Sequence, residues 1–204
     1  MTIEEIDLHR MGREDLAKYL PGRGCPERGA KNGEELAVAL QDKKFRAVEC
    51  PDIDRRLAET IDRVLSIDVH LPESDPAMQK VPEKLFEHNS PDDSSPVIIT
   101  GNSIITHQIL SLILGSTGTK AFVLPVDTMG YTVDNAVHEN KLTPMAVMRA
   151  LTDSGISRKT SSRKALLPGA ARDQKSSIER ITRWGMEVGP VSGFELPLYL
   201  LGRP

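Results

Sequence analysis

Short apolar runs alternate with helical segments along the second half of the chain. Short runs of mostly apolar residues lie at 97–100, 121–126, 165–168 and 186–188, which predicts strands buried on both faces. The segments between them have helical periodicity and predict helices at 104–114, 145–154 and 174–183, with Gly115 ending the first. This alternation predicts an α/β fold: a Rossmann-like, mostly parallel sheet with flanking helices.

The first half of the chain predicts helices without strands. Thr2-Ile3-Glu4-Glu5 fits a capping box for a short opening helix, and residues 13–20 and 34–42 predict two more. A fourth helix is predicted by five apolar residues at helical spacing, namely Ile53, Leu57, Ile61, Val64 and Leu65.

Prolines and polar residues then fill positions 68–95 and predict a linker. We therefore expect a small helical module over residues 1–52, a helix and Pro-rich linker over 53–95, and an α/β domain over 96–204.

Composition narrows the functional classes. The 204 residues carry a net charge of −3, and only 4% of them are aromatic, which gives no reason to expect nucleic acid as a partner. The hydrophobic content of 39% includes no run of the roughly 20 apolar residues that a membrane helix needs. The acidic N-terminus does not have the pattern of a signal peptide, so we expect a cytoplasmic protein.

Each predicted strand ends in a loop of small residues. These loops are Thr100–Ser103, Thr128–Asn135, Gly169-Ala170-Ala171 and Gly189–Gly193. Because parallel strands place their carboxyl ends at one edge of a sheet, the loops predict a shallow ligand-binding edge. The first loop has no G-x-G-x-x-G motif, and no acidic residue ends the second strand unless Asp127 serves, so a nucleotide is a weaker alternative ligand. The chain contains no G-x-S-x-G or H-E-x-x-H motif.

Several segments resemble, in order and spacing, the C-terminal domain of the large subunit of the corrinoid iron–sulfur protein, the methyl carrier of the reductive acetyl-CoA pathway. They are Thr100-Gly101-Asn102, Val126–Val133, Asn140–Pro144, Arg163–Gly169 and Trp184–Gly193. The stretch Gly130–Leu142 is also similar to the cap helix of mercury-methylating corrinoid proteins.

The resemblance implies that the α/β domain binds a cobamide, a cofactor of the vitamin B12 type, with its lower base off the cobalt. It also implies that the binding residues lie in the four strand-end loops. They are Thr100, Gly101, Asn102, Ser103, Thr128, Gly130, Tyr131, Thr132, Val133, Asn135, Gly169, Ala170, Ala171, Gly189, Pro190, Ser192 and Gly193.

A second part of the resemblance is degenerate. The family binds a 4Fe–4S cluster through four cysteines, and this chain keeps Cys25 and Cys50 but has Arg28 and Gly33 at the two other positions. Two thiolates are too few for such a cluster, so we expect no intact iron–sulfur cluster and interpret the cysteines as free thiols. A cluster shared between two subunits and a Cys25–Cys50 disulfide are the alternatives. Residues 52–95 are too few for the family's middle barrel domain, so we expect it to be missing here.

The resemblance places Thr132–Val137 below the corrinoid, with Asn135 facing the cobalt. An amide is a weak ligand for cobalt, which favours reduction of the metal. An alternative is that Asn135 only caps a turn.

We expect a methyl carrier in one-carbon metabolism, a component of a corrinoid-dependent methyltransferase system rather than a stand-alone enzyme. Its expected partners are a methyltransferase and an external electron donor, and the oligomeric state stays open. A non-catalytic corrinoid storage or interaction protein is the alternative function.

Overall fold

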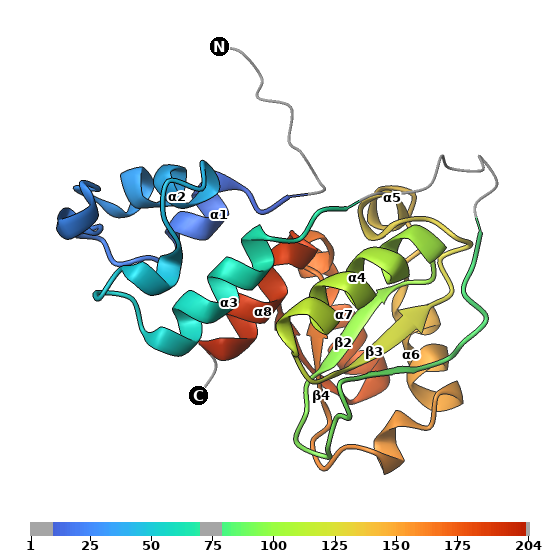
Figure 1. Ribbon diagram of the computed structural model, residues 1–204. Helices are drawn as coiled ribbons and strands as arrows, with labels where there is room; N and C mark the ends of the chain where they lie inside the picture. The colour runs from blue at the N-terminus through green and yellow to red at the C-terminus, as the bar shows by residue number, and fades with distance from the viewer. Residues whose placement is uncertain (1–9, 70–78, 203–204) are drawn as a thin grey trace. The chain divides into compact units, whose positions relative to one another are not determined.

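The computed structural model describes residues 10–69 and 79–202, and these fall into two units (Figure 1). Unit 1 combines residues 1–69 with residues 192–204, and unit 2 covers residues 70–191. The opening helix expected from Thr2–Glu5 lies outside the described residues. No helix within 10–69 or 79–202 is both long and apolar enough to cross a membrane.

Unit 1 is helical, as the sequence predicts. Its α-helices are α1 (Arg13–Ala17), α2 (Gly33–Gln41), α3 (Arg55–Leu65) and α8 (Leu196–Leu201), and its 3-10 turns are η1 (Pro26–Arg28), η2 (Ala47–Glu49) and η5 (Gly193–Glu195). The starts of α2 and α3 follow from capping, because the Asn32 side chain accepts a hydrogen bond from the backbone N–H of Glu35 and Asp54 accepts one from Leu57.

Helix α8 was not predicted, and residues 192–204 were expected in the α/β domain. The helix instead packs against α3 within unit 1. Pro197 is compatible with a helix because it lies in the first turn, and Leu196 and Leu198 are buried. The turn before the helix is held by Glu195, whose carboxylate accepts a hydrogen bond of 3.4 Å from the Tyr19 hydroxyl and lies 3.6 Å from the Lys18 ammonium group.

Unit 2 contains a five-stranded sheet in the order β1-β3-β2-β4-β5. The strands are β1 (Phe86–His88), β2 (Val97–Gly101), β3 (Ala121–Val126), β4 (Lys164–Leu167) and β5 (Gly185–Val188). All neighbouring pairs are parallel except β1 with β3, so the expected mostly parallel α/β fold is confirmed.

Strand β1 lies in the segment that we expected to be a linker. A bridge between Lys80 and Ser103 also places the start of this described segment beside the sheet. The pattern of the sequence did not reveal β1 because Phe86-Glu87-His88 is too short to show an alternation of apolar and polar residues.

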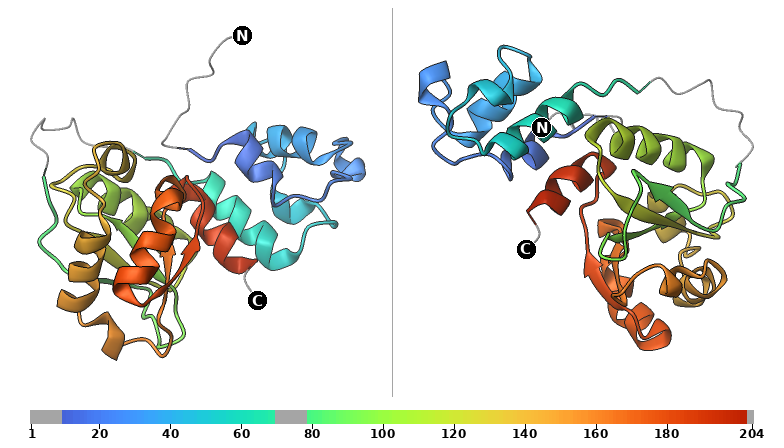
Figure 2. Two further views of the ribbon diagram at one scale, coloured as in Figure 1. Left: turned by 180° about the vertical axis from the view of Figure 1, so that it is seen from behind. Right: turned by 60° about the horizontal axis from the view of Figure 1, so that its bottom comes forward.

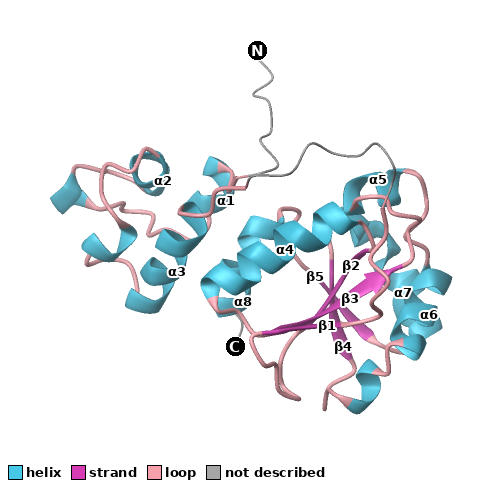
Figure 3. Cartoon of the chain, turned by 45° about the vertical axis from the view of Figure 1, so that its right-hand side comes forward, coloured by secondary structure: helices cyan, strands magenta, loops and turns pink. Residues whose placement is uncertain are grey.

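Helices cover both faces of the sheet. They are α4 (Ile104–Thr117), α5 (Val133–His138), α6 (Pro144–Asp153) and α7 (Lys175–Thr182), with 3-10 segments η3 (Ile156–Arg158) and η4 (Gly169–Gln174). Figure 3 shows α4 on one face and α6 with α7 on the other, and Figure 2 shows α6 and α7 from behind. Helix α4 continues through Gly115, where we expected it to end, and Gly118 in the left-handed conformation (φ 68°) terminates it instead.

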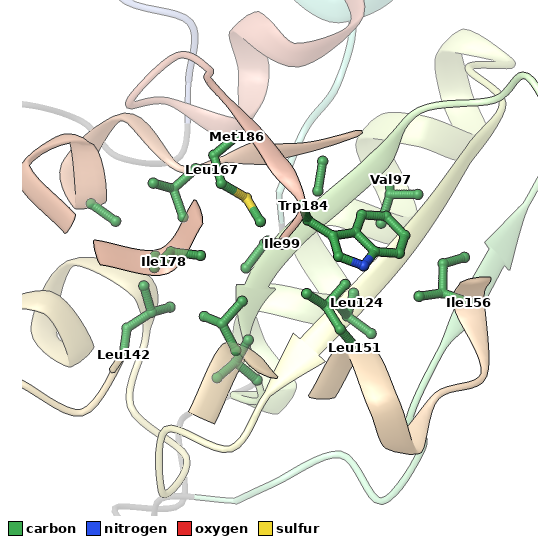
Figure 4. Close-up of a cluster of buried hydrophobic side chains, with 14 of the residues drawn as sticks. Val97, Ile99, Leu124, Leu142, Leu151, Ile156, Leu167, Ile178, Trp184 and Met186 are labelled. Carbon is green, nitrogen blue, oxygen red and sulfur yellow. The ribbon is translucent and has the colours of Figure 1, made fainter. Parts of the chain in front are cut away.

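The main core lies between the sheet and helices α5, α6 and α7 (Figure 4). Alternate residues of the strands point into it, including Val97 and Ile99 of β2 and Leu124 of β3. Leu151 of α6 and Ile178 of α7 meet them from the helical layer. This packing fixes the strand ends from which the candidate site is built.

The opposite face of the sheet buries a histidine. His107 of α4 is 4% exposed, and its ring packs against that of Phe86, with 4.5 Å between the ring centroids and 31° between the ring planes. Its Nε2 lies 3.1 Å from the carbonyl oxygen of Gly101, so Nε2 is the donor atom in the neutral ring, and Nδ1 is buried without a partner among the described residues. Burial lowers the pKa of His107 from its usual 6.5 to about 4, although the Gly101 carbonyl and the charge of Glu83 act in the opposite direction; nearby His88 lowers the pKa further.

We predict that the protein loses stability in mild acid because of His107. His107 binds a proton near pH 6.5 in the unfolded state and only near pH 4 in the folded state. The stability that depends on its neutral ring is therefore fully present above pH 6.5 and is lost as the pH falls towards 4. The difference between these two pKa values corresponds to roughly 3 kcal/mol. Urea unfolding at pH 7 and pH 4.5 measures the change in the free energy of unfolding. In a His107→Gln variant this free energy should depend less on pH. An equal pH dependence in the variant and the wild type would contradict the assignment to His107.

Candidate functional site

The carboxyl ends of β2, β3, β4 and β5 meet at one edge of the sheet, as expected for parallel strands. Strand β2 is central, the chain passes from β2 to β3 on one side, and it then returns to β4 on the other side. The loops after β2 and β4 therefore diverge at this point, which is where open α/β sheets commonly bind ligands. Helix α5 contacts β2 and η4 at the same edge (Figure 1).

Asn102 is the centre of a hydrogen-bond network that joins the loops after β2 and β3. The residue is 7% exposed, and its Oδ1 accepts hydrogen bonds from three donors on the second loop: the backbone N–H of Thr128 (3.1 Å), the hydroxyl of Thr128 (3.1 Å) and the backbone N–H of Gly130 (3.0 Å). Thr128 is fully buried, and its Oγ1 also lies 3.0 Å from the carbonyl oxygen of Tyr131. These two residues therefore fix the shape of the second loop rather than face solvent.

Asp127 and Lys80 complete the network at the surface. The Oδ1 atom of Asp127 accepts hydrogen bonds from the Asn102 amide (3.0 Å), from the backbone N–H of Met129 (3.1 Å) and from the Lys80 ammonium group (3.3 Å). The hydrogen bond from Met129 is the largest cause of a lowered pKa for Asp127, and Lys80 and Asn102 add to it. All three hydrogen bonds use Oδ1, and the Asp127 side chain is 72% exposed.

Thr128–Tyr131 form a tight turn at the end of β3. The N–H of Tyr131 donates to the carbonyl of Thr128 at 3.2 Å, and the two central residues both have left-handed backbones, with φ 61° at Met129 and φ 85° at Gly130. Glycine adopts this conformation without a steric penalty, whereas Met129 does not. The side chain of Met129 is 53% exposed.

Helix α5 follows this turn and carries Asn135. Asn135 is exposed, and its side-chain amide has no hydrogen-bond partner among the described residues. The N-cap position of α5 belongs to Thr132, so Asn135 is not the cap of this helix. Ala136, one residue later, is buried in the main core and anchors the helix.

The loops after β4 and β5 are in close backbone contact. A Cβ atom on Gly169 would lie 2.8 Å from the backbone nitrogen of Val191 and 2.9 Å from the carbonyl oxygen of Gly189. A Cβ on Gly101 would similarly lie 2.9 Å from the hydroxyl of Thr128 and from the carbonyl of Tyr131. These glycines are required where loops of neighbouring strands touch, which is a structural role that the sequence alone did not reveal.

The structure divides the predicted site residues by exposure. Tyr131, Thr132, Val133, Ala170 and Pro190 are partly exposed in unit 2, and Asn135 is exposed. Ser192 and Gly193 belong to unit 1, where the Ser192 hydroxyl accepts a hydrogen bond of 3.3 Å from the backbone of Phe194. The other predicted residues are buried beneath the loops: Thr100, Gly101, Asn102, Ser103, Thr128, Gly130, Gly169, Ala171 and Gly189.

Sequence reasoning missed three residues of this edge: Lys80, Asp127 as a loop anchor, and Met129. Lys80 was assigned to the linker, far from the loops in sequence. The sequence did contain a signal for the role of Asp127. An Asp side chain commonly accepts a hydrogen bond from the backbone N–H two residues later in a turn, and here that N–H belongs to Met129.

The thiols of unit 1 do not fit a four-thiolate cluster. Cys25 and Cys50 are both buried, and burial, followed by a hydrogen bond with Cys50, raises the pKa of Cys25 to about 11. Arg28 instead forms a salt bridge of 2.9 Å with Glu49, and its guanidinium group lies 5.9 Å from the ring centroid of Phe45. In residues 10–69 and 79–202, no group of three or more His, Cys, Asp or Glu side chains could hold a metal ion.

Known proteins similar to this chain include the family that the sequence resembles. The model of the CO dehydrogenase/acetyl-CoA synthase delta subunit family matches residues 66–199, more than half of the chain. The acetyl-CoA decarbonylase/synthase complex subunit gamma of Methanopyrus kandleri is 31% identical over 122 residues, which cover 60% of this chain and 26% of the relative. The corrinoid/iron-sulfur protein large subunit of Moorella thermoacetica is 29% identical over 111 residues, covering 54% and 25% respectively.

The subunit gamma 2 of the same type of complex from Methanosarcina thermophila is 31% identical over 136 residues, covering 64% of this chain and 29% of the relative. The chain therefore spans about a quarter of the length of the curated relatives it matches.

Proposed function

Because the chain belongs to the CO dehydrogenase/acetyl-CoA synthase delta subunit family, we propose that it binds a cobamide, base-off, at the carboxyl edge of unit 2 and serves as a methyl carrier with partner methyltransferases. The observation that carries the proposal is the convergence of small-residue loops from parallel strands around the end of central β2. An open edge of this kind suits a broad ligand better than an enclosed cavity does.

The exposed groups of this edge fit a corrinoid, which has an apolar ring system surrounded by amide side chains. Val133, Ala170 and Pro190 are partly exposed apolar residues, while Thr132 supplies a hydroxyl and Asn135 an exposed amide. The buried network of Asn102 and the loop contacts of Gly169 hold these groups in place before a ligand binds. Preorganisation of this kind lowers the entropic cost of binding.

The bound cobalt would supply the centre that accepts and releases the methyl group. The residues of the chain would bind and orient the cofactor, with Asn135 on the exposed surface of α5 facing its lower side. An uncharged amide is a poor ligand compared with a thiolate, so it would leave the lower side of the metal weakly coordinated. We propose that a separate protein supplies electrons, because the cysteines of unit 1 are too few for a four-thiolate cluster.

Reconstitution tests this proposal. The full chain is incubated anaerobically with hydroxocobalamin and gel-filtered, and we expect about one corrinoid per chain in the protein peak. The loaded protein is then reduced and mixed with a corrinoid methyltransferase and its radiolabelled methyl donor. Label on the protein-bound corrinoid supports a carrier, binding without label indicates a storage or interaction protein, and absence of corrinoid from the protein peak contradicts the proposal.

We also predict that the anaerobically purified protein contains no iron–sulfur cluster. Arg28 places a cation, paired with Glu49, where the family pattern has a thiolate, and Gly33 offers no ligand at all. Iron and sulfide analysis checks this prediction, and we expect close to zero iron and sulfide per chain. About four irons per chain would contradict the prediction, and about two would favour the cluster shared between subunits.

A further inference from the structure

We propose that Met129 is a contact residue for the cofactor, presented by a strained turn that the loop network holds in place; this inference rests on the proposed function. Met129 has a left-handed backbone with φ 61°, a conformation that disfavours side chains other than those of Asn and Asp. Strain of this kind persists only where the surroundings impose it, and it is found most often at functional sites.

The surroundings of Met129 do impose this conformation. Its backbone N–H donates to Asp127, and the next N–H, that of Gly130, donates to the buried Oδ1 of Asn102. The Lys80 ammonium group lies 3.3 Å from the same Oδ1 atom of Asp127 and offsets its negative charge. The turn is therefore fixed by polar contacts of the backbone and of neighbouring side chains, and none of these contacts uses the thioether of Met129.

The position of the side chain indicates its role. At 53% exposure, Met129 is among the few large apolar side chains that unit 2 leaves in solvent. Two others belong to the same edge: Val191, 69% exposed, follows the carboxyl end of β5, and Met145, 46% exposed, begins α6, which must run from this edge back to the start of β4. Large apolar side chains left exposed along this edge are available for contact with a bound molecule.

The chemistry of a thioether suits a corrinoid as the occupant. The ring periphery carries methyl and methylene groups between its amides, and methionine is a flexible, polarisable side chain that adapts to such irregular apolar surfaces. A glycine at position 129 would form the same turn without strain, so the backbone itself gives no reason for a long side chain there. The geometry therefore points to the ligand as the partner of this side chain.

The test measures hydroxocobalamin affinity and thermal stability on the full chain. We expect Met129→Gly to weaken binding by about tenfold, the scale of one lost apolar contact, while the melting temperature stays equal or rises because the strain is removed. Met129→Leu should bind within about threefold of the wild type. Leu112→Ala, which removes a 40% exposed apolar side chain from the middle of α4, is the matched control and should bind as the wild type does.

The outcomes separate this inference from the proposed function. If the wild type binds and Met129→Gly binds equally well, Met129 is not a contact residue, although the site stands. If Met129→Gly loses both affinity and stability, the side chain supports the turn and the inference is overturned. If the wild type itself does not bind hydroxocobalamin, both the proposed function and this inference fall.

Discussion

Replacing Asn102 by alanine is expected to lower the free energy of unfolding by about 3–5 kcal/mol and to abolish cofactor binding. The substitution removes the Oδ1 atom that accepts hydrogen bonds from two backbone N–H groups and one hydroxyl, all in the buried part of the loop after β3. A buried donor left without a partner costs about 1–3 kcal/mol. The Met129–Gly130 turn also loses its anchor, so the strained conformation is no longer imposed.

Urea denaturation and hydroxocobalamin titration of the variant provide the measurement. Asn135→Ala is the matched control for stability, because the same amide is deleted from an exposed position where it has no described partner, and a change within about 0.5 kcal/mol is expected. If Asn102→Ala were as stable as Asn135→Ala, the network would not hold the loops.

Replacing Gly169 by alanine is expected to destabilise the protein by about 3 kcal/mol and to weaken cofactor binding. The new Cβ would meet three backbone atoms of residues 189–191 at 2.8–2.9 Å, and backbone cannot turn aside as a flexible side chain can. The loops after β4 and β5 must therefore separate, which costs packing and breaks the hydrogen bond from the Gly169 N–H to the carbonyl of Pro190.

The control for this substitution is Gly115→Ala in α4. A Cβ at Gly115 meets nothing within 4 Å, and alanine is the better helix former, so this variant should be equally stable or up to about 1 kcal/mol more stable. Thermal melts of the two variants side by side give the comparison. Equal melting temperatures would show that the loops after β4 and β5 can separate without cost.

The regular elements of the fold could be predicted because their signals are local. The run Ala121–Val126 is strand β3 to the residue, and the Thr143-Pro144 start of α6 follows from capping, with the Thr143 hydroxyl accepting a hydrogen bond from Ala146. Strand β1 and helix α8 could not be predicted because their formation depends on partners distant in the sequence, β3 and α3 respectively. Their own residues are too few to show periodicity.

The candidate site could be predicted as a set of loops but not as a set of exposed groups. Polar and small residues after strands mark the edge, yet they do not reveal which of them face solvent. Asn102 and Asn135 have chemically identical side chains, but Asn102 is buried at the centre of a hydrogen-bond network and Asn135 is exposed on helix α5. Met129 was missed because its turn also depends on Asn102, which lies in the loop of another strand and which no local pattern connects to it.

Hydrogen–deuterium exchange of the full chain, with and without hydroxocobalamin, tests the central proposal most directly, because it reports both binding and its location. The account predicts slower exchange in peptides that cover residues 100–103, 128–135, 169–171 and 189–191 when the cofactor is present. Peptides from α2 in unit 1 should be unchanged. Exchange that is the same in both states, or protection confined to the helices of unit 1, would contradict a cobamide site at the carboxyl edge of the sheet.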